Sequence, residues 1–245
     1  MPDDHARSAA YPAAVAYIHR HCVAERDLAA AVGIPAAALQ ALAEAEVVPC
    51  ATYRIGPQGV WSQITRLGIV DFATAEGFFA PAAIGWLRRA ALLAEDTAPA
   101  DLRGALEAWL AADLATALDA QHDAARAFGW GHLFEGDRCD PILALTEARS
   151  CWGDWMDGVW AVCLRRFDGH HLAVKEIERG RIARLTSGCE ARALPAADRL
   201  ALLDAMARLD AVLMPFAPHE RADTTPGLFL DRPAAQYGLP WPPPG

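Results

Sequence analysis

Apolar residues recur every three or four positions along most of the chain, the spacing of helices that bury one face. The strongest pattern follows Thr97 and Pro99, which suit the start of a helix, and continues for about 25 residues before Gly129 and Gly131 end it. Similar patterns predict helices over residues 11–22, 81–93, 169–188 and 195–212. Most of the chain is therefore expected to be helical.

Two shorter patterns stand before residue 65. Residues 27–48 are typical of a helix-turn-helix, with Gly33 in the tight turn and Pro35 at the start of the second helix. Residues 52–55 and 60–64 flank Gly56-Pro57-Gln58-Gly59, a composition that favours a hairpin turn. The predicted fold class is mainly α, an irregular helical domain with an N-terminal helix-turn-helix-like unit and one short β-hairpin.

The same patterns suggest three units along the chain. Residues 1–50 form the N-terminal helix-turn-helix-like unit, residues 51–221 the helical main domain, and residues 222–245 a Pro-rich C-terminal tail. The final Pro-Trp-Pro-Pro-Pro-Gly is compatible with an extended chain but not with a helix.

The helix-turn-helix pattern lacks the chemistry of DNA recognition. Its second helix offers one glutamine, two acids and no cation, and no basic residue stands between Arg26 and Arg54. Phosphate would repel this helix, so we expect a packing or docking module and no nucleic-acid partner.

Composition points the same way. The chain has 245 residues, 53% of them hydrophobic, a formal net charge of −9 and a sequence pI of about 5.3. This balance favours a small substrate or a protein partner over a polyanion. No apolar run is long enough for a membrane span, and the acidic start is unlike a signal peptide. We therefore expect a cytoplasmic protein without a membrane partner, its six cysteines reduced.

Lys175 is the one lysine among 22 basic residues. Either it survived a strong bias toward arginine, or an amine that can lose its proton was needed at this position. Lys175 lies at the edge of an apolar arc formed by Val174, Ile177 and Leu185, where partial removal from water would favour the neutral amine.

Two charged residues fall inside that arc. Glu178 and Arg181 stand three positions apart, so they are interpreted as an internal ion pair or as part of a site.

Trp152, Trp155, Val159 and Val162 recur at helical spacing in a tryptophan-rich segment. This spacing is typical of a helix that faces the core. The alternative is an aromatic pocket wall with Asp154 or Asp157 at its rim. The spacing does not distinguish the two.

The segment after Pro215 and Pro218 carries His219, Glu220 and Arg221 in succession. Two prolines fix the backbone, and a histidine held beside an acid suits general acid–base catalysis. A structural turn, in which Glu220 and Arg221 bond to the backbone or to each other, fits the pattern equally well.

The sequence contains no phosphate-binding loop, dinucleotide fingerprint or nucleophile elbow, and no two cysteines stand at metal-binding spacing. We therefore expect neither a cofactor nor a metal.

The chain resembles a bacterial family of unknown function, usually labelled natural product biosynthesis protein and common in actinomycetes. The resemblance extends from about Tyr11 to about Arg221 and has no single diagnostic motif. It rests on Asp27-Leu28-Ala29, Thr52-Tyr53, Phe128-Gly129-Trp130, Trp152 with Trp155, Lys175-Glu176 and Phe216-Ala217-Pro218-His219-Glu220. Ala51-Thr52 departs from the usual proline and serine before the tyrosine, which weakens any role for that loop. The resemblance implies a biosynthetic context and assigns no mechanism.

The sequence thus predicts a metal-independent, non-redox acid–base enzyme that catalyses elimination or ring closure on a small amino-acid-derived or carrier-linked substrate. Lys175 would be the base or electrostatic stabiliser, Glu176 its orienting partner, and His219 with Glu220 a second proton-transfer group. The residues expected to bind substrate are Trp152, Trp155, Asp157, Arg181 and Arg221. The alternative is a non-catalytic accessory protein that docks onto and stabilises an enzyme of the same pathway.

Overall fold

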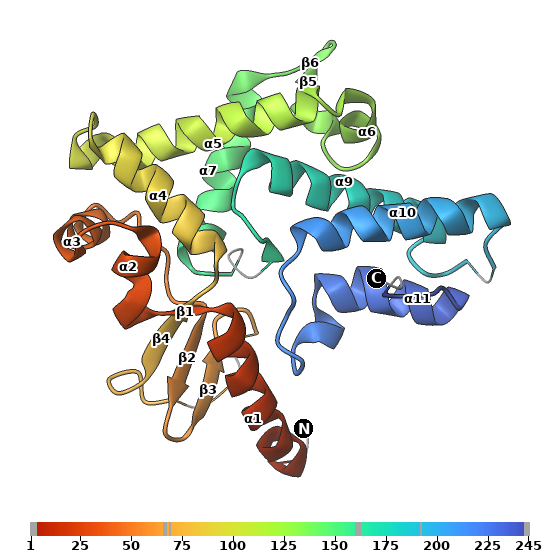
Figure 1. Cartoon of the computed structure of the whole chain (residues 1–245). Coiled ribbons are helices and arrows are strands. Elements are labelled where there is room, and N and C mark those ends of the chain that lie inside the picture. Colours follow the sequence, from red (N-terminus) through yellow and green to blue (C-terminus); the bar gives the residue numbers. More distant parts are fainter. Residues whose placement is uncertain (1–3, 66–67, 69, 160–162, 192, 243–245) are drawn as a thin grey trace.

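The computed structural model describes residues 4–65, 68, 70–159, 163–191 and 193–242 (Figure 1). Within these ranges the helices are α1 (Asp4–His21), α2 (Leu28–Val32), α3 (Ala36–Glu44), α4 (Ala82–Ala94), α5 (Leu102–Asp119), α6 (His122–Ala127), α7 (Pro141–Met156), α9 (Gly169–Thr186), α10 (Ala196–Val212) and α11 (Arg232–Tyr237). The strands are β1 (Val23–Ala24), β2 (Tyr53–Gly56), β3 (Gly59–Ser62), β4 (Glu76–Phe79), β5 (Phe134–Glu135) and β6 (Arg138–Cys139). The mainly α fold class is confirmed.

The helix-turn-helix-like unit consists of α2 and α3. Gly33 takes a left-handed conformation with φ 83°, and its amide donates to the carbonyls of Ala29 and Ala30. Glycine suits this position because it has no Cβ to clash in left-handed backbone. The segment Glu25–Val32 and α3 are bent by 106°, and both helices pack on α4.

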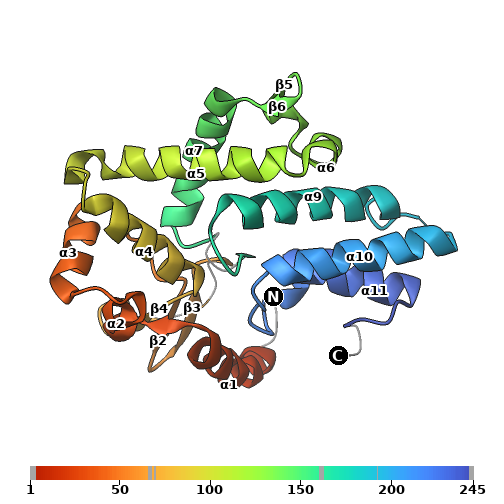
Figure 2. The same cartoon turned by 45° about the horizontal axis from the view of Figure 1, so that its top comes forward.

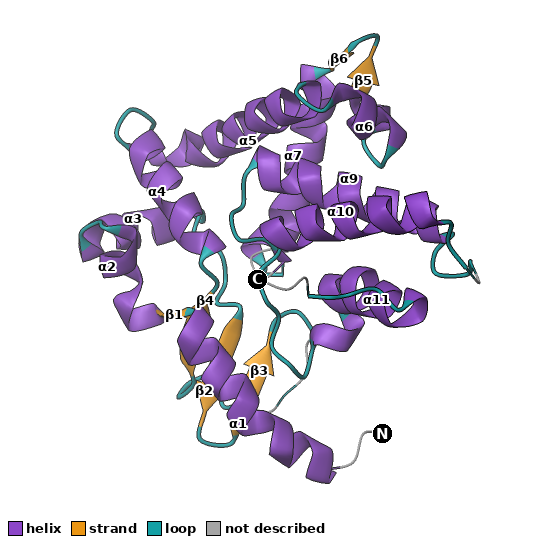
Figure 3. Ribbon diagram, turned by 45° about the vertical axis from the view of Figure 1, so that its right-hand side comes forward, coloured by secondary structure: helices purple, strands orange, loops and turns teal. Residues whose placement is uncertain are grey.

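The predicted hairpin is present as β2 and β3, and it belongs to a larger sheet. Four antiparallel strands follow the order β1-β4-β2-β3. Figure 3 shows these strands gathered beside α1, while helices make up most of the remaining structure. Because β1 pairs with β4, backbone hydrogen bonds cross the expected boundary at residue 50. The division into three units stays a prediction.

The helices after the sheet pack around α9. Helix α5 contacts α7 and α9, and α9 also contacts α10 (Figures 1 and 2). Leu172 and Ile177 of α9 belong to a large core shared with α4, α5 and α7, whereas Val174 and Ile182 belong to a second core shared with α10 and α11. Helix α9 is therefore buried from two sides.

The long predicted helix after Pro99 is interrupted. A short 3₁₀ segment, Pro99–Asp101, precedes α5, and Gln121 leaves helical geometry between α5 and α6. At this point the Asp119 carboxylate accepts the Cys139 amide at 2.7 Å. The redirected α6 still buries Ala125 completely. The spacing of apolar residues continues across this break, so the sequence pattern did not predict that the helix ends here.

No single helix in the described ranges is long and apolar enough to cross a membrane, and only the bent pair Glu25–Val32 and Ala36–Glu44 meets the length and composition criteria together.

Candidate functional site

Lys175 lies on α9 and is buried, with 4% of its surface exposed. Its Nζ stands 3.4 Å from Oε1 of Glu176. Both Glu176 oxygens also accept hydrogen bonds from Nη1 of Arg179, at 2.8 and 2.7 Å. The carboxylate thus links an ammonium and a guanidinium on one helix. Such an arrangement holds the acid in one orientation beside the Lys175 amine. The expected role of Glu176, to orient that amine in a reaction, stays a prediction.

Two thiols lie within the electrostatic reach of Lys175. Burial raises the pKa of Cys151 to about 12, and the Lys175 charge opposes this shift only in part. Burial likewise raises the pKa of Cys163, against the lowering effects of Lys175 and Arg179. Both thiols therefore stay protonated at neutral pH and are poor nucleophiles.

His219 and Glu220 do not form the pair expected from the sequence. His219 is exposed, whereas Glu220 retains only 2% of its surface. Glu220 accepts hydrogen bonds from the Tyr53 hydroxyl at 2.9 Å and the Thr65 hydroxyl at 3.0 Å. The carboxylate therefore ties the segment after α10 to the sheet. A tyrosine and a threonine more than 150 positions away in sequence left no local signal of this contact.

A second tyrosine extends the Glu220 cluster. Tyr17 of α1 meets the Tyr53 ring edge-on at 6.2 Å, and its hydroxyl donates to the Pro215 carbonyl. Burial and then the Glu220 charge raise the pKa of Tyr53 well above 10.0. Burial, with smaller effects from Cys22 and Glu220, also raises the pKa of Tyr17. Both phenols stay protonated and remain hydrogen-bond donors.

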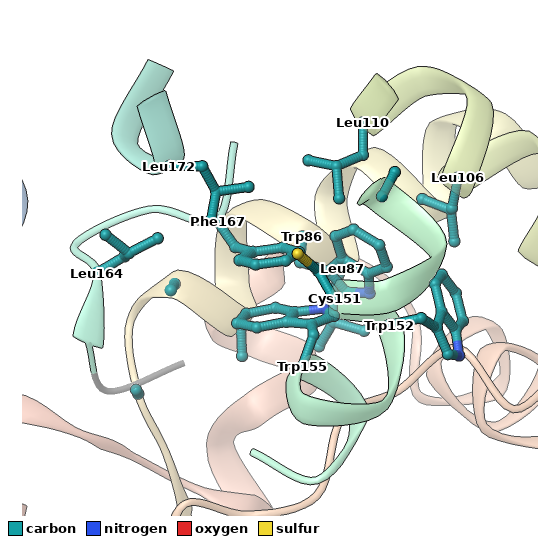
Figure 4. Close-up of a cluster of buried hydrophobic side chains, with 14 of the residues drawn as sticks. Trp86, Leu87, Leu106, Leu110, Cys151, Trp152, Trp155, Leu164, Phe167 and Leu172 are labelled. Carbon is teal, nitrogen blue, oxygen red and sulfur yellow. The ribbon is translucent and has the colours of Figure 1, made fainter. Parts of the chain in front are cut away.

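Both tryptophans of this segment belong to the large core, and Trp152 also lines a cavity. Trp155 is fully buried, and its ring stacks on Phe167 with centroids 4.1 Å apart (Figure 4). Trp152 is 7% exposed and meets Trp86 edge-on at 5.6 Å. The guanidinium of Arg103 lies 5.0 Å above the Trp152 ring. Val162, the last member of the predicted stripe, lies outside the described residues.

The remaining predicted binding residues occupy different places. Asp157 is exposed and caps the C-terminus of α7. Nε of Arg181 lies 3.5 Å from Oε2 of Glu178, which agrees with the internal ion pair expected from their spacing. Glu178 is 1% exposed, and burial raises its pKa despite Arg181 and Arg208. Arg181 is therefore already engaged by a buried carboxylate.

Arg221 lies in the wall of a cavity of about 700 Å³. Its Nε and Nη2 bind the two carboxylate oxygens of Asp231 at 2.6 and 2.9 Å. Asp210 and Trp241 line the same space. A second cavity, of about 500 Å³, is lined by Trp152 and Arg103. Neither cavity is lined by Lys175, Trp155 or His219.

The part of the chain that the structure describes contains no cluster of side chains suited to a metal ion. There, no group of three or more histidine, cysteine, aspartate or glutamate side chains is placed to hold a metal ion.

One protein family has a model that matches residues 141–238, less than half of the chain. It is described as a family of unknown function (DUF6058). The matched range runs from α7 to the residue after α11 and contains every residue predicted to bind or react with substrate. No curated protein and no solved structure matches the chain. The match agrees with the resemblance to a family of unknown function and assigns no activity.

Proposed function

We propose that this chain acts in natural product biosynthesis as a cytoplasmic, metal-independent and non-redox acid–base enzyme. Its substrate would be a small amino-acid-derived molecule, free or linked to a carrier, and the reaction an elimination or ring closure. Neither nucleic acid nor a membrane is a partner in this proposal.

The burial of Lys175 is the observation that carries the proposal. An ammonium group removed from water at 4% exposure is costly unless it is paired or serves a function. Arginine meets nearly every basic need of this chain, yet arginine cannot release its proton near neutral pH. A buried lysine in such a chain favours a role that requires proton release.

In this proposal the neutral Lys175 amine accepts a proton from the substrate, and the resulting electron pair expels a leaving group or closes a ring. The Glu176 carboxylate, held by Arg179, orients the amine and stabilises its protonated form. His219, exposed on its loop, exchanges protons with solvent or substrate. Glu220 acts as a positioning residue, because its bonds to Tyr53 and Thr65 hold that loop.

The test begins by deleting the gene from its host and comparing small-molecule extracts by mass spectrometry. Ions that disappear and return with the wild-type gene report the function in cells. Lys175→Arg keeps the charge and removes the base, so it should lower recovery of these ions by about 100-fold or more. Thermal unfolding of the purified variant must show that it still folds.

Lys175→Met serves as the matched variant because methionine has a similar length and no charge. If Lys175→Arg restores the ions fully, Lys175 is not a base. If Lys175→Arg is active and Lys175→Met is inactive, the group acts as an electrostatic stabiliser instead. If deletion changes no small molecule, the biosynthetic proposal fails.

A second candidate is an accessory protein that docks onto a pathway enzyme. It is favoured by the exposed face of α3, where Ala36, Ala37 and Ala41 lie in solvent and Glu44 at the end of the helix is the one charged residue. Co-expression with enzymes encoded beside the gene, followed by size-exclusion chromatography, tests for a complex. Ala37→Glu should dissociate a complex that uses this face, while leaving the thermal unfolding of the chain by itself unchanged.

A further inference from the structure

A surface cavity of about 500 Å³ lies between the end of α3, the start of α5 and the C-terminal part of α7. Its lining combines charged and apolar groups, including Glu44, Glu46, Pro99, Arg103, Trp152 and Met156. The volume falls within the usual range for small-molecule sites.

The Glu107 carboxylate and the Trp152 ring position the Arg103 side chain. Its Nε donates to Oε1 of Glu107 at 2.8 Å, and Oε2 of Glu107 accepts from Arg149 at 3.1 Å. Glu107 is 5% exposed, so this anchor is a buried carboxylate. The guanidinium also lies over the Trp152 ring. Across the described ranges, neither terminal nitrogen of Arg103 makes a hydrogen bond, so both remain able to bind a carboxylate.

Glu46 provides the opposite charge from an unusual backbone position. It follows the last turn of α3 with φ 57°, in the left-handed region where glycine is the ordinary choice. Its carboxylate has no hydrogen-bond or ion-pair partner in the described ranges. Strained positions that persist tend to lie at functional sites. Ser187 at the end of α9 is left-handed as well, so what sets Glu46 apart is its place in the lining of the cavity.

We propose that this cavity binds a zwitterionic α-amino acid or a close derivative with a free ammonium and carboxylate. The ligand carboxylate binds the terminal nitrogens of Arg103, and its ammonium binds Glu46 with Glu44 beside it. The apolar part of the ligand packs against Trp152, Met156 and Pro99. The inference goes beyond the proposed function, because Lys175 does not line this cavity and a ligand bound here would not meet the proposed base.

Ligand-observed NMR with the twenty proteinogenic amino acids, each up to about 10 mM, tests the site in the full-length protein. Binding of at least one amino acid is expected. Its N-acetyl and carboxamide derivatives, which lack the ammonium or the carboxylate, should bind about ten-fold or more weakly. Absence of binding overturns the proposal, and so does equal affinity for the carboxamide, which would indicate a site for simple amines.

Glu46→Gly separates this role from a structural one. Glycine relieves the left-handed strain, so the variant should melt at a higher temperature than the wild type while binding about ten-fold or more weakly. Ser187→Gly is the matched control, because Ser187 is left-handed at the end of α9 and does not line the cavity. It should raise the melting temperature and leave affinity unchanged. Unaltered affinity in Glu46→Gly would overturn the proposal.

Arg103→Gln completes the test from the carboxylate side and should weaken the amino acid about ten-fold or more without affecting an amine that lacks a carboxylate. Lys175→Arg should keep full affinity. If Lys175→Arg loses activity but the wild type binds no amino acid, the binding site is refuted and the catalytic proposal stands. If the wild type binds an amino acid but activity does not depend on Lys175, the catalytic proposal is refuted and the binding site stands.

Discussion

Adjacent residues in the segment after α10 meet opposite environments, and this decides their chemistry. The Glu220 carboxylate is enclosed by hydroxyl donors, so its lone pairs are used within the protein. His219, one position earlier, is exposed. A histidine beside an acid in sequence therefore does not amount to a catalytic pair, because the two side chains leave the backbone in different directions.

Trp155 offers a test of whether the tryptophans belong to the core or to a pocket. Its ring is fully buried, stacked on Phe167 and 5.4 Å from Trp86. Trp155→Ala should therefore lower the free energy of unfolding by about 3–5 kcal/mol, measured by urea denaturation followed by circular dichroism.

The matched control for this substitution is Trp155→Phe. The indole Nε1 of Trp155 has no hydrogen-bond partner in the part of the chain that the structure describes. Phenylalanine keeps most of the ring volume and removes that buried N–H, so it should cost less than about 1.5 kcal/mol. A loss below about 1 kcal/mol in Trp155→Ala would instead indicate that the ring lines an open pocket.

At the scale of elements, the packing of α9 determines where its charged residues lie. The helix is buried from two sides, so its first turn must fit tightly against α5. A Cβ at Gly169 would stand 2.2 Å from the Leu114 amide nitrogen, and the Gly169 amide donates to Asp113 at 2.7 Å. Only glycine allows this approach, and the crossing sets where Lys175 enters the interior.

The N-cap of α9 yields a prediction for Asp168. Its Oδ1 accepts from the amide of His171 at 2.8 Å and from Nδ1 of the same residue at 2.7 Å. Asp168→Ala should destabilise the protein by about 1 kcal/mol near neutral pH, because the first turn loses an acceptor. Asp168→Asn, which retains an acceptor, should recover most of the loss in urea denaturation.

The same residue predicts a dependence on acid. Burial alone would raise the pKa of Asp168, but hydrogen bonds from His171 outweigh it and the pKa falls below 3.8. A lowered folded pKa means that the stabilisation is present above the unfolded value and is lost as pH falls through the folded value. The difference in stability between the wild type and Asp168→Ala should therefore narrow as pH falls below about 4, down to the part of the cap that a neutral acceptor supplies. A constant difference there would contradict this assignment.

At the scale of the whole molecule, buried thiols and phenols link the folded state to pH. Burial raises the pKa of Cys22 and of Cys151 from 9.0 to about 12, and it raises the pKa of Tyr53 well above 10.0. The unfolded chain releases these protons at lower pH than the folded chain does. Because the unfolded state then binds fewer protons, the free energy of unfolding falls as pH rises.

We therefore expect stability to be nearly level up to about pH 8.5 and to decline above it, by up to about 1.4 kcal/mol per pH unit for each such group. Urea denaturation between about pH 7 and pH 11 measures the decline. Cys151→Ala removes one of the groups and should make the slope shallower. A slope unchanged by Cys151→Ala would assign the decline to other groups.

The sequence pattern predicted those features that depend on residues close together in the chain. The hairpin, the turn at Gly33, the helix that begins after Asp168 and the Glu178–Arg181 pair all follow from residues a few positions apart. Strands β1 and β4 were missed because β1 is two residues long and owes its existence to its pairing with β4.

For the candidate site, the sequence by itself singled out Lys175, placed it at the edge of an apolar arc and put Glu176 beside it. The spacing of apolar residues also predicted a mainly helical chain, and composition showed its excess of acidic charge. These properties depend on residue type and on spacing within one helix, which the chain carries whatever its tertiary packing.

Only the tertiary structure decided that Glu220 faces Tyr53 and Thr65, that Trp155 belongs to the core, and that Arg103 lies over Trp152 in one cavity with Glu46. Most of these contacts join residues far apart along the chain. Their energies come from burial and hydrogen bonding between elements, and no local pattern records which elements will meet.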